Sequence, residues 1–272
     1  MDTPLGPLFG YERLGPPRRG LAYLSCLARC YLAGACFNTR GFLNVGLAFA
    51  IYPGLTAIHH HDPEALREAK RRYVRHFHTH PFWLPCLVGI FLSAERLIAA
   101  GQLPAAMLEK VKNTTSYTLS AIGDSVFAGS VLIFWALASA CLLLAGERMA
   151  PLLLGVIFFL GLQGFRAYTF WLGLRRGFSV LERIRRWDLI NWGQKVKYAN
   201  GLLLAWLWWL LCPPPVDWRQ WAAGAAVVSL FGLASWRRQV PRPVVLAGIL
   251  GLLAALPWLG QWLREGLTRL TG

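Results

Sequence analysis

Apolar residues gather in runs along the chain, and short polar or basic stretches separate the runs. Several runs approach or exceed the ~20 residues that a membrane-spanning helix needs. The pattern predicts full spans over 125–146, 150–174 and 244–263. It also predicts two shorter runs, 198–212 and 218–236, that form a hairpin around the Pro-rich turn at 213–215.

The N-terminal half is interrupted more often. An apolar helix over 21–35 is followed by a polar segment, and the pattern resumes at 42–51 before Pro53 and Gly54 end it. Such short pieces are typical of re-entrant helices, which survive in lipid only when protein or a wet cavity surrounds them. Asn38 and Asn44 are the polar residues that a cavity would use, although turn and helix-packing roles explain them equally well.

A charged helix is predicted over 63–78, because Asp62 is a good N-cap and Pro63 suits the first helical position. Three His follow at alternate positions, His76, His78 and His80, with Pro81 after them. Alternate residues of a helix do not share a face, so a shared metal site would require extended backbone here. A simpler role for His80 is that of a hinge residue that bonds backbone or sugar hydroxyls. A further short apolar segment, 82–94, is closed by Glu95 and Arg96.

Two isolated opposite charges lie in the predicted spans. Asp124 is the only formally charged residue between Lys112 and Glu147, and Arg166 is the only one between Arg148 and Arg175. Ionisable groups inside a bilayer tend to face a cavity, a partner charge or a substrate path. Asp124 is therefore expected to be the N-cap of the span that begins at Ser125, to pair with Arg166 or approach a common polar site with it, or to do both, since the two roles are compatible.

Composition agrees with a membrane protein, since 56% of the residues are hydrophobic and only 15% are charged. The net charge of +15 comes from Lys and Arg clustered between apolar runs. That placement fits cytoplasmic loops under the positive-inside rule better than nucleic-acid binding. The basic stretch 175–197 is expected to be such a loop. The six Cys lie in apolar surroundings without a CxxC pair, so reduced, small hydrophobic side chains are expected.

Three motifs, taken together, resemble the IID component of the mannose/fructose/sorbose family of the bacterial sugar phosphotransferase system. They are Phe37-Asn38 followed by Asn44-Val45-Gly46, then His78-Thr79-His80-Pro81-Phe82 after a basic helix, then Gly123-Asp124-Ser125-Val126-Phe127. Arg166, Tyr168, Gly173 and Gly177 also resemble a pattern of that family. The chain differs from the family at Arg40-Gly41, where Glu-Arg is common, and at Ala128, where a Trp is common.

The resemblance implies a non-catalytic membrane subunit without a phosphorylation site or cofactor. With a IIC component it forms the unit that translocates a hexose, while soluble IIA and IIB components carry phosphate to the sugar. The expected setting is a hetero-oligomer in the bacterial inner membrane, in contact with lipid and not with nucleic acid. Residues expected to line or brace the sugar path are Asn38, Asn44, Thr79, His80, Gly123, Asp124, Ser125 and Arg166.

The expected fold is an all-α, polytopic helical membrane protein, with broken or re-entrant helices in the N-terminal half and full spans in the C-terminal half. The expected parts are a cytoplasmic arm (1–20), a transporter core (21–180), and a basic loop with anchoring helices (181–272). Two alternatives stay open. The altered motif residues motivate a degenerate homologue that acts in regulation or assembly, and the six His motivate a membrane metalloenzyme.

Overall fold

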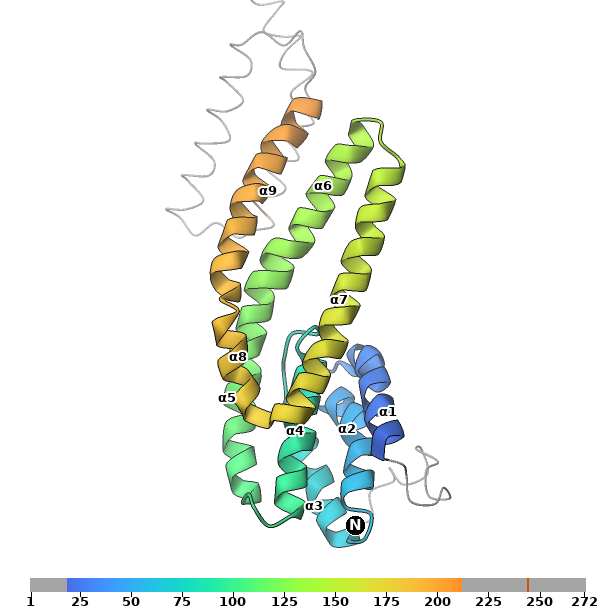
Figure 1. The fold of residues 1–272 in the computed structure, drawn as a ribbon, viewed down its shortest axis with the longest axis vertical. Helices are drawn as coiled ribbons and strands as arrows, with labels where there is room; N and C mark the ends of the chain where they lie inside the picture. The colour runs from blue at the N-terminus through green and yellow to red at the C-terminus, as the bar shows by residue number, and fades with distance from the viewer. Residues whose placement is uncertain (1–18, 212–243, 245–272) are drawn as a thin grey trace, which may run out of the picture. The chain divides into compact units, whose positions relative to one another are not determined.

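The computed structural model describes residues 19–211 and Val244, and its elements in this part of the chain are all helical (Figure 1). The chain forms two compact units, Met1–Leu207 and Trp208–Gly272. The account that follows concerns the first unit. The helical elements are α1 (Arg19–Leu32), η2 (Ala33–Cys36), α2 (Asn44–Ile58), α3 (Pro63–Tyr73), α4 (Leu84–Ala99), α5 (Ala105–Gly123), η3 (Asp124–Val131), α6 (Leu132–Leu144), α7 (Met149–Arg176), η4 (Gly177–Ser179), α8 (Val180–Arg186) and α9 (Leu189–Leu211).

Some expectations lie outside the described residues. They are the arm at 1–18, the proline turn at 213–215, the run at 218–236 and most of the span at 244–263. Within the described part, α1–α4 pack together beside the C-terminal half of α7, while α6 and the rest of α7 extend beyond them as an antiparallel pair (Figure 1).

Helix α2 does not end at Pro53 and Gly54 as the pattern predicted, but continues to Ile58 with Pro53 inside it. A proline within a helix leaves the carbonyl four residues earlier without its usual donor. Here that carbonyl belongs to Phe49, and the Nη1 of Arg29 on α1 donates to it at 3.2 Å. The amide of Gly54 lies 3.2 Å from the Cys26 sulfur, which is also on α1. Contacts from a neighbouring helix thus allow α2 to pass through the proline.

Helix α3 begins as predicted. Asp62 is its N-cap, with the Ala65 amide donating to Oδ1 at 2.9 Å, and Pro63 is the first helical residue. The helix ends at Tyr73 rather than near His78, because the segment after it pairs with the turn around Phe42. Helix α4 runs four residues past the predicted closure at Glu95, and that carboxylate is fully buried.

One continuous helix, Ala105–Leu144, replaces the predicted connector and the predicted span starting at Ser125. Asp124 is therefore not a helix N-cap. It opens η3, a π-helical segment in which the Ser130 hydroxyl donates to the Ser125 carbonyl at 2.8 Å. The polar residues of α5 are compatible with a helix because hydroxyls bond back to the preceding turn, as Ser116 does to the carbonyl of Lys112 at 2.7 Å.

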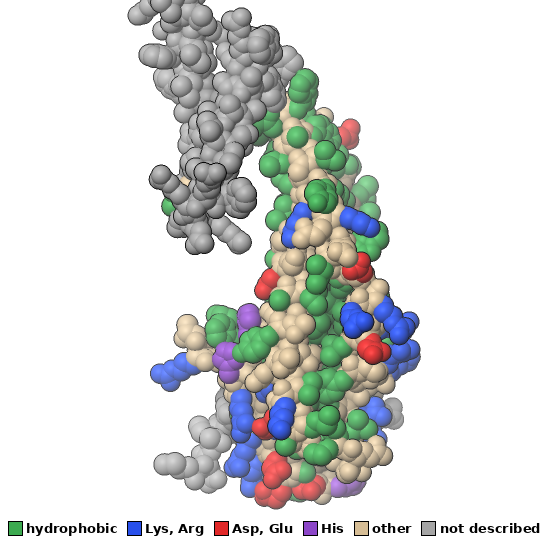
Figure 2. Space-filling model, turned by 90° about the vertical axis from the view of Figure 1, so that its left-hand side faces the viewer, with side chains coloured by type: hydrophobic (Ala, Val, Ile, Leu, Met, Phe, Trp, Pro, Cys, Tyr) green, Lys and Arg blue, Asp and Glu red, His purple; other side chains and the backbone are tan. Residues whose placement is uncertain are grey.

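Ala105–Leu144 and Met149–Arg186 are long and apolar enough to cross a membrane, judged by length and composition. None of the residues in the most apolar stretch of the second is buried within the protein, unlike the core helix of a soluble domain. On the face in Figure 2, hydrophobic side chains cover most of the upper part, and Lys and Arg gather lower down. The basic stretch 175–197 is helical rather than a loop, with Val180 and Ile184 buried under exposed Arg side chains.

Helices α4 and α7 cross closely because glycines face each other's backbone. A Cβ on Gly89 of α4 would collide with the carbonyl oxygen of Phe170, and one on Gly173 of α7 would collide with the carbonyl oxygen of Cys86. Small residues at such a crossing let two backbones approach, which is a common basis of helix association in membranes.

Replacing Gly89 by Ala should lower the free energy of unfolding by about 1–3 kcal/mol, since α4 and α7 must separate to admit the methyl group. Titration of the detergent-solubilised protein with a denaturing detergent measures this change. Gly161→Ala on α7 is the matched control, because nothing lies within 4 Å of its Cβ position. Equal stability of the Gly89→Ala variant and the parent would contradict the close crossing.

Candidate functional site

Between α3 and α4, residues 76–80 are extended, as a site shared by the alternating His residues would require, and residues 81–83 form a turn into α4. The Phe77 amide donates to the Gly41 carbonyl at 3.2 Å, and the Phe77 carbonyl accepts from the Leu43 amide at 2.9 Å. This pairing holds the segment against the turn that joins η2 to α2. Within residues 19–211, no three His, Cys, Asp or Glu side chains lie close enough together to hold a metal ion.

Asn38 and Asn44 stabilise that turn. The Nδ2 of Asn38 donates to the Asn44 Oδ1 at 2.9 Å, and the Asn38 Oδ1 accepts from the Gly41 amide at 2.7 Å. Asn44 also reaches across to α3, where its Nδ2 donates to the Val74 carbonyl at 2.8 Å. The geometry therefore assigns a bracing role to these two residues, one of the two roles that their sequence pattern allowed.

His80 and Gly123 lie in direct contact. A Cβ on Gly123 would collide with the His80 side chain, so only glycine lets α5 approach this closely. The imidazole stacks on Phe127 with ring centroids 5.5 Å apart. Through Gly123 the contact joins the 76–83 segment to Asp124 and Ser125, the next residues of the same helix.

Several buried polar atoms around this contact have no hydrogen-bond partner among the described residues. They are Nδ1 of His78, Oγ1 of Thr79 and Nε1 of Trp83 on the 76–83 segment, and Nε of Arg166 on α7. Buried polar groups are almost always paired in native proteins, by protein, water or ligand. The unpaired atoms of residues 78–83 and of Arg166 are therefore open positions for an outside hydroxyl, carbonyl or water.

Asp124 and Arg166 do not pair, contrary to one of the two predicted arrangements. Asp124 is exposed and forms no ion pair within the described residues. Arg166 turns toward α1, where its Nη2 donates to the Cys30 carbonyl at 3.3 Å and its guanidinium lies 3.9 Å from the Tyr31 ring centre. Ser125 instead lies near a cation of α9, since its hydroxyl is 3.5 Å from the Lys197 Nζ.

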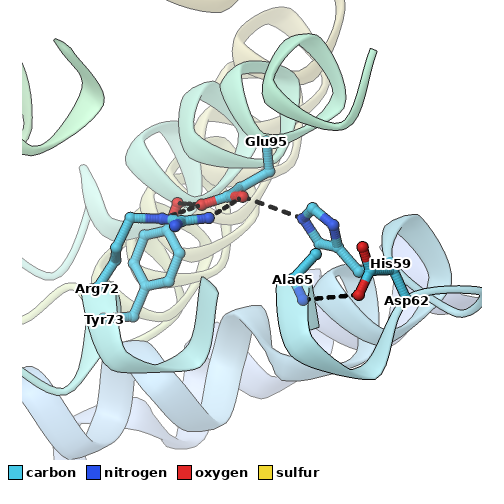
Figure 3. A network of polar contacts seen from close by, with 6 residues as sticks. All are labelled: His59, Asp62, Ala65, Arg72, Tyr73 and Glu95. Atoms are coloured by element: carbon cyan, nitrogen blue, oxygen red, sulfur yellow. Dashed lines mark hydrogen bonds and ion pairs between the residues drawn. The ribbon is translucent and has the colours of Figure 1, made fainter. Parts of the chain in front are cut away.

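Sequence reasoning missed the most buried charge in the described part of the protein, Glu95 on α4 (Figure 3). Arg72 donates to it from Nε at 3.0 Å and from Nη2 at 2.7 Å, and the Tyr73 hydroxyl donates at 2.9 Å. The His59 Nε2 lies 3.1 Å from Oε2, and it must carry the hydrogen because a carboxylate only accepts. Glu95 is the single carboxylate between Glu68 and Glu109, which is the signal that could have identified it.

This cluster also fixes the root of the 76–83 segment. Arg72 and Tyr73 are the last two residues of α3, and the buried ammonium of Lys112 donates to the Arg72 carbonyl at 2.6 Å. Carbonyls at a helix C-terminus lack intrahelical donors, and Lys112 supplies a donor to one of them at the end of α3. Helices α2, α4 and α5 together set the position from which the segment starts.

The family model described as "PTS system mannose/fructose/sorbose family IID component" matches residues 22–202, which include every residue named in this site. This chain is a member of the IID family. Among curated relatives, the IID chain is similar to the mannose-specific EIID component of Escherichia coli, at 26% identity over 155 residues. That match covers 57% of this chain and 55% of the relative, or about half of its length.

Two solved structures share the fold of this IID protein at 19% identity. One is a cryo-EM structure of the mannose transporter ManYZ in complex with a microcin, with a TM-score of 0.54 over 86% of this chain and 94% of the other. The second is described as a membrane protein, with a TM-score of 0.70 over 91% and 98% of the two chains. The expectation of an all-α, polytopic helical membrane protein is thus confirmed.

Replacing Glu95 by Gln should lower the free energy of unfolding by about 3–5 kcal/mol, because the Arg72 guanidinium is left buried without its counter-charge. Glu109→Gln is the matched control. Glu109 forms an ion pair with Arg75, and the two side chains are 37% and 68% exposed, respectively. Loss of such an exposed pair should change the free energy of unfolding by about 0–1 kcal/mol. Denaturing-detergent titration measures both variants, and similar losses would contradict the importance of burial.

The same carboxylate makes stability depend on pH. Burial raises the pKa of Glu95, but the hydrogen bonds from His59 and Arg72 outweigh burial and hold the pKa below its ordinary value of 4.5. The stabilisation is therefore complete above pH 4.5 and is lost as the pH falls toward the lower folded-state pKa. The melting temperature of the parent protein should fall below that pH, whereas that of the Glu95→Gln variant should lose this part of the dependence. If the melting temperatures of the parent and the variant changed with pH in the same way, Glu95 would not be the group responsible.

Proposed function

We propose that this IID protein is a membrane subunit that pairs with a IIC component to form the sugar-translocating unit of a phosphotransferase system. Soluble IIA and IIB components would phosphorylate the hexose as it enters, and we assign no phosphorylation site or catalytic step to this chain. The observation that carries the proposal is the family match across residues 22–202. The exposed apolar stretch within Met149–Arg186 supports a place in the bacterial inner membrane with several crossings.

The sugar path that we propose lies beside the contact of His80 with Gly123. Thr79 presents an unpaired buried hydroxyl there, and Asp124 presents a free carboxylate at the start of the π-helical segment. A neutral sugar offers hydroxyl groups that both donate and accept, so unpaired donors and a carboxylate are suitable partners. π-Helical segments occur often at functional sites. In this proposal Asn38 and Asn44 brace the path rather than contact the sugar.

Two basic surfaces are suited to the soluble phosphate-carrying component. One consists of the exposed Arg67 and Arg71 of α3 and Arg75 just after it. The other includes Arg175, Arg183 and Arg185 near α8. The alternative is that these residues only set the orientation of the protein in the membrane, because cytoplasmic segments are generally rich in Lys and Arg.

A second candidate function is regulation or assembly by a homologue that no longer transports. The observation that favours it is the departure from the family motifs around the proposed path. Ala128, where a Trp is common, is exposed beside Phe127, so the path lacks a large aromatic side chain there. A sugar could therefore not stack on an aromatic ring at position 128.

Co-expression with the IIC component, co-purification and hexose binding test both functions. Asp124→Asn should leave the complex intact and weaken hexose binding by roughly tenfold or more, the loss expected for a hydrogen bond to a charged group. Asp188→Asn, at an exposed carboxylate that bonds Asn191, is the control and should bind as the parent does. A stable complex that binds no hexose would favour the regulatory function, and failure to form any complex would refute the proposal.

A further inference from the structure

Arg166 is a half-buried cation whose charge no residue of the described part neutralises. It lies on α7, about 25 Å along the helix from Met149 and about 15 Å from the basic end at Arg176, given a rise of 1.5 Å per residue. The stretch around it is long and apolar enough to cross a membrane. A charge at that depth is costly unless a counter-charge or a wet cavity receives it.

The contacts of Arg166 satisfy only part of its guanidinium. Nη2 donates to the Cys30 carbonyl at 3.3 Å, and the rings of Tyr31 and Phe82 lie 3.9 and 6.0 Å from the guanidinium carbon. Its Nε is buried without a partner. The ion pairs of the described residues all lie elsewhere, on α2, α3, α4 and α5. A guanidinium has five N–H donors, so a carboxylate could still be bound through two of them.

The surface around Arg166 is apolar and exposed. Tyr31 is 43% exposed and Leu32 61%, and both belong to the end of α1 toward which the arginine turns. A charged centre surrounded by aromatic and aliphatic side chains is typical of protein interfaces, where Arg and Tyr often contribute most of the binding energy. We call the three residues Tyr31, Leu32 and Arg166 the Arg166 patch.

We propose that the Arg166 patch is a contact surface for the IIC component and that Arg166 binds a carboxylate in a membrane span of that partner. The inference rests on the proposed function, since it names the surface through which the two subunits pair. Charge complementarity carries it, because the unneutralised guanidinium needs an anion at its own depth. Arg175 and Arg176 lie nearer to where lipid headgroups gather, so a lipid phosphate would meet them first.

The test is co-purification of the full-length IID chain with the IIC component from a membrane that contains anionic lipid. Arg166→Gln should reduce recovery of the complex at least about tenfold, and Arg166→Lys should retain part of it, because lysine keeps the charge but not the two-donor geometry. Arg148→Gln, at the exposed arginine that precedes the same helix, is the control and should co-purify as the parent does. The melting temperature of each isolated variant separates loss of docking from loss of folding.

A charge exchange keeps the test decisive if Arg166→Gln is unstable alone. Arg166→Glu should abolish recovery, and substitution of one intramembrane carboxylate of the IIC component by lysine should restore it. Undiminished recovery of Arg166→Gln would overturn the inference while leaving the proposed function intact. Failure of the parent protein to co-purify would instead refute the proposed function. If removal of anionic lipid lowers recovery of the parent complex as much as Arg166→Gln does, the site binds a lipid phosphate, and the inference is overturned.

Discussion

The need to neutralise one buried carboxylate organises the described part of this IID protein. Glu95 is fully buried on α4, and its burial is tolerated only because Arg72, Tyr73 and His59 approach it from α3 and from the end of α2. An ionised group removed from water without such partners would be strongly destabilising. The same bonds fix where α3 ends, and therefore where the 76–83 segment begins. The position of His80 beside Gly123 depends on a charge that is itself remote from the candidate site.

The long helix that carries Asp124 shows how polar residues are accommodated in a helix that can cross a membrane. Its hydroxyl groups bond to carbonyls of their own helix, as in Ser116 and Ser130. The π-helical segment shifts that bonding by one residue, and Asn200 of α9 donates to the Ser130 carbonyl at 3.0 Å. Backbone groups that lack water must be satisfied by protein. Polar side chains from α9 therefore support the irregular turn next to the candidate site.

Local signals in the sequence predicted local structure, and contacts between helices decided the rest. Asp62 and Pro63 predicted the start of α3 because capping depends only on neighbouring residues. Pro53 suggested a helix end, but α2 continues because Arg29 donates to the Phe49 carbonyl, and these two residues are 20 positions apart in sequence. The predicted pairing of Asp124 with Arg166 failed for the same reason, since opposite charge does not specify geometry. The three motifs, in their order along the chain, correctly predicted the family, because a family is identified by sequence and does not require a particular contact to be known.

Glu95 is a fully buried charge and Arg166 a half-buried one, and their different surroundings suggest different roles. Glu95 is surrounded by donors from its own chain, so its partners fold with it and it acts within the subunit. Arg166 is held by one carbonyl and two aromatic rings, with Nε left unpaired, although the protein has carboxylates that could have been placed there. A subunit that folds before it assembles must keep such a group stable without its final partner, and stacking on Tyr31 does so. The contacts with Tyr31 and Phe82 hold the guanidinium in the position where, in the assembly that we propose, a carboxylate of the IIC component would bind it.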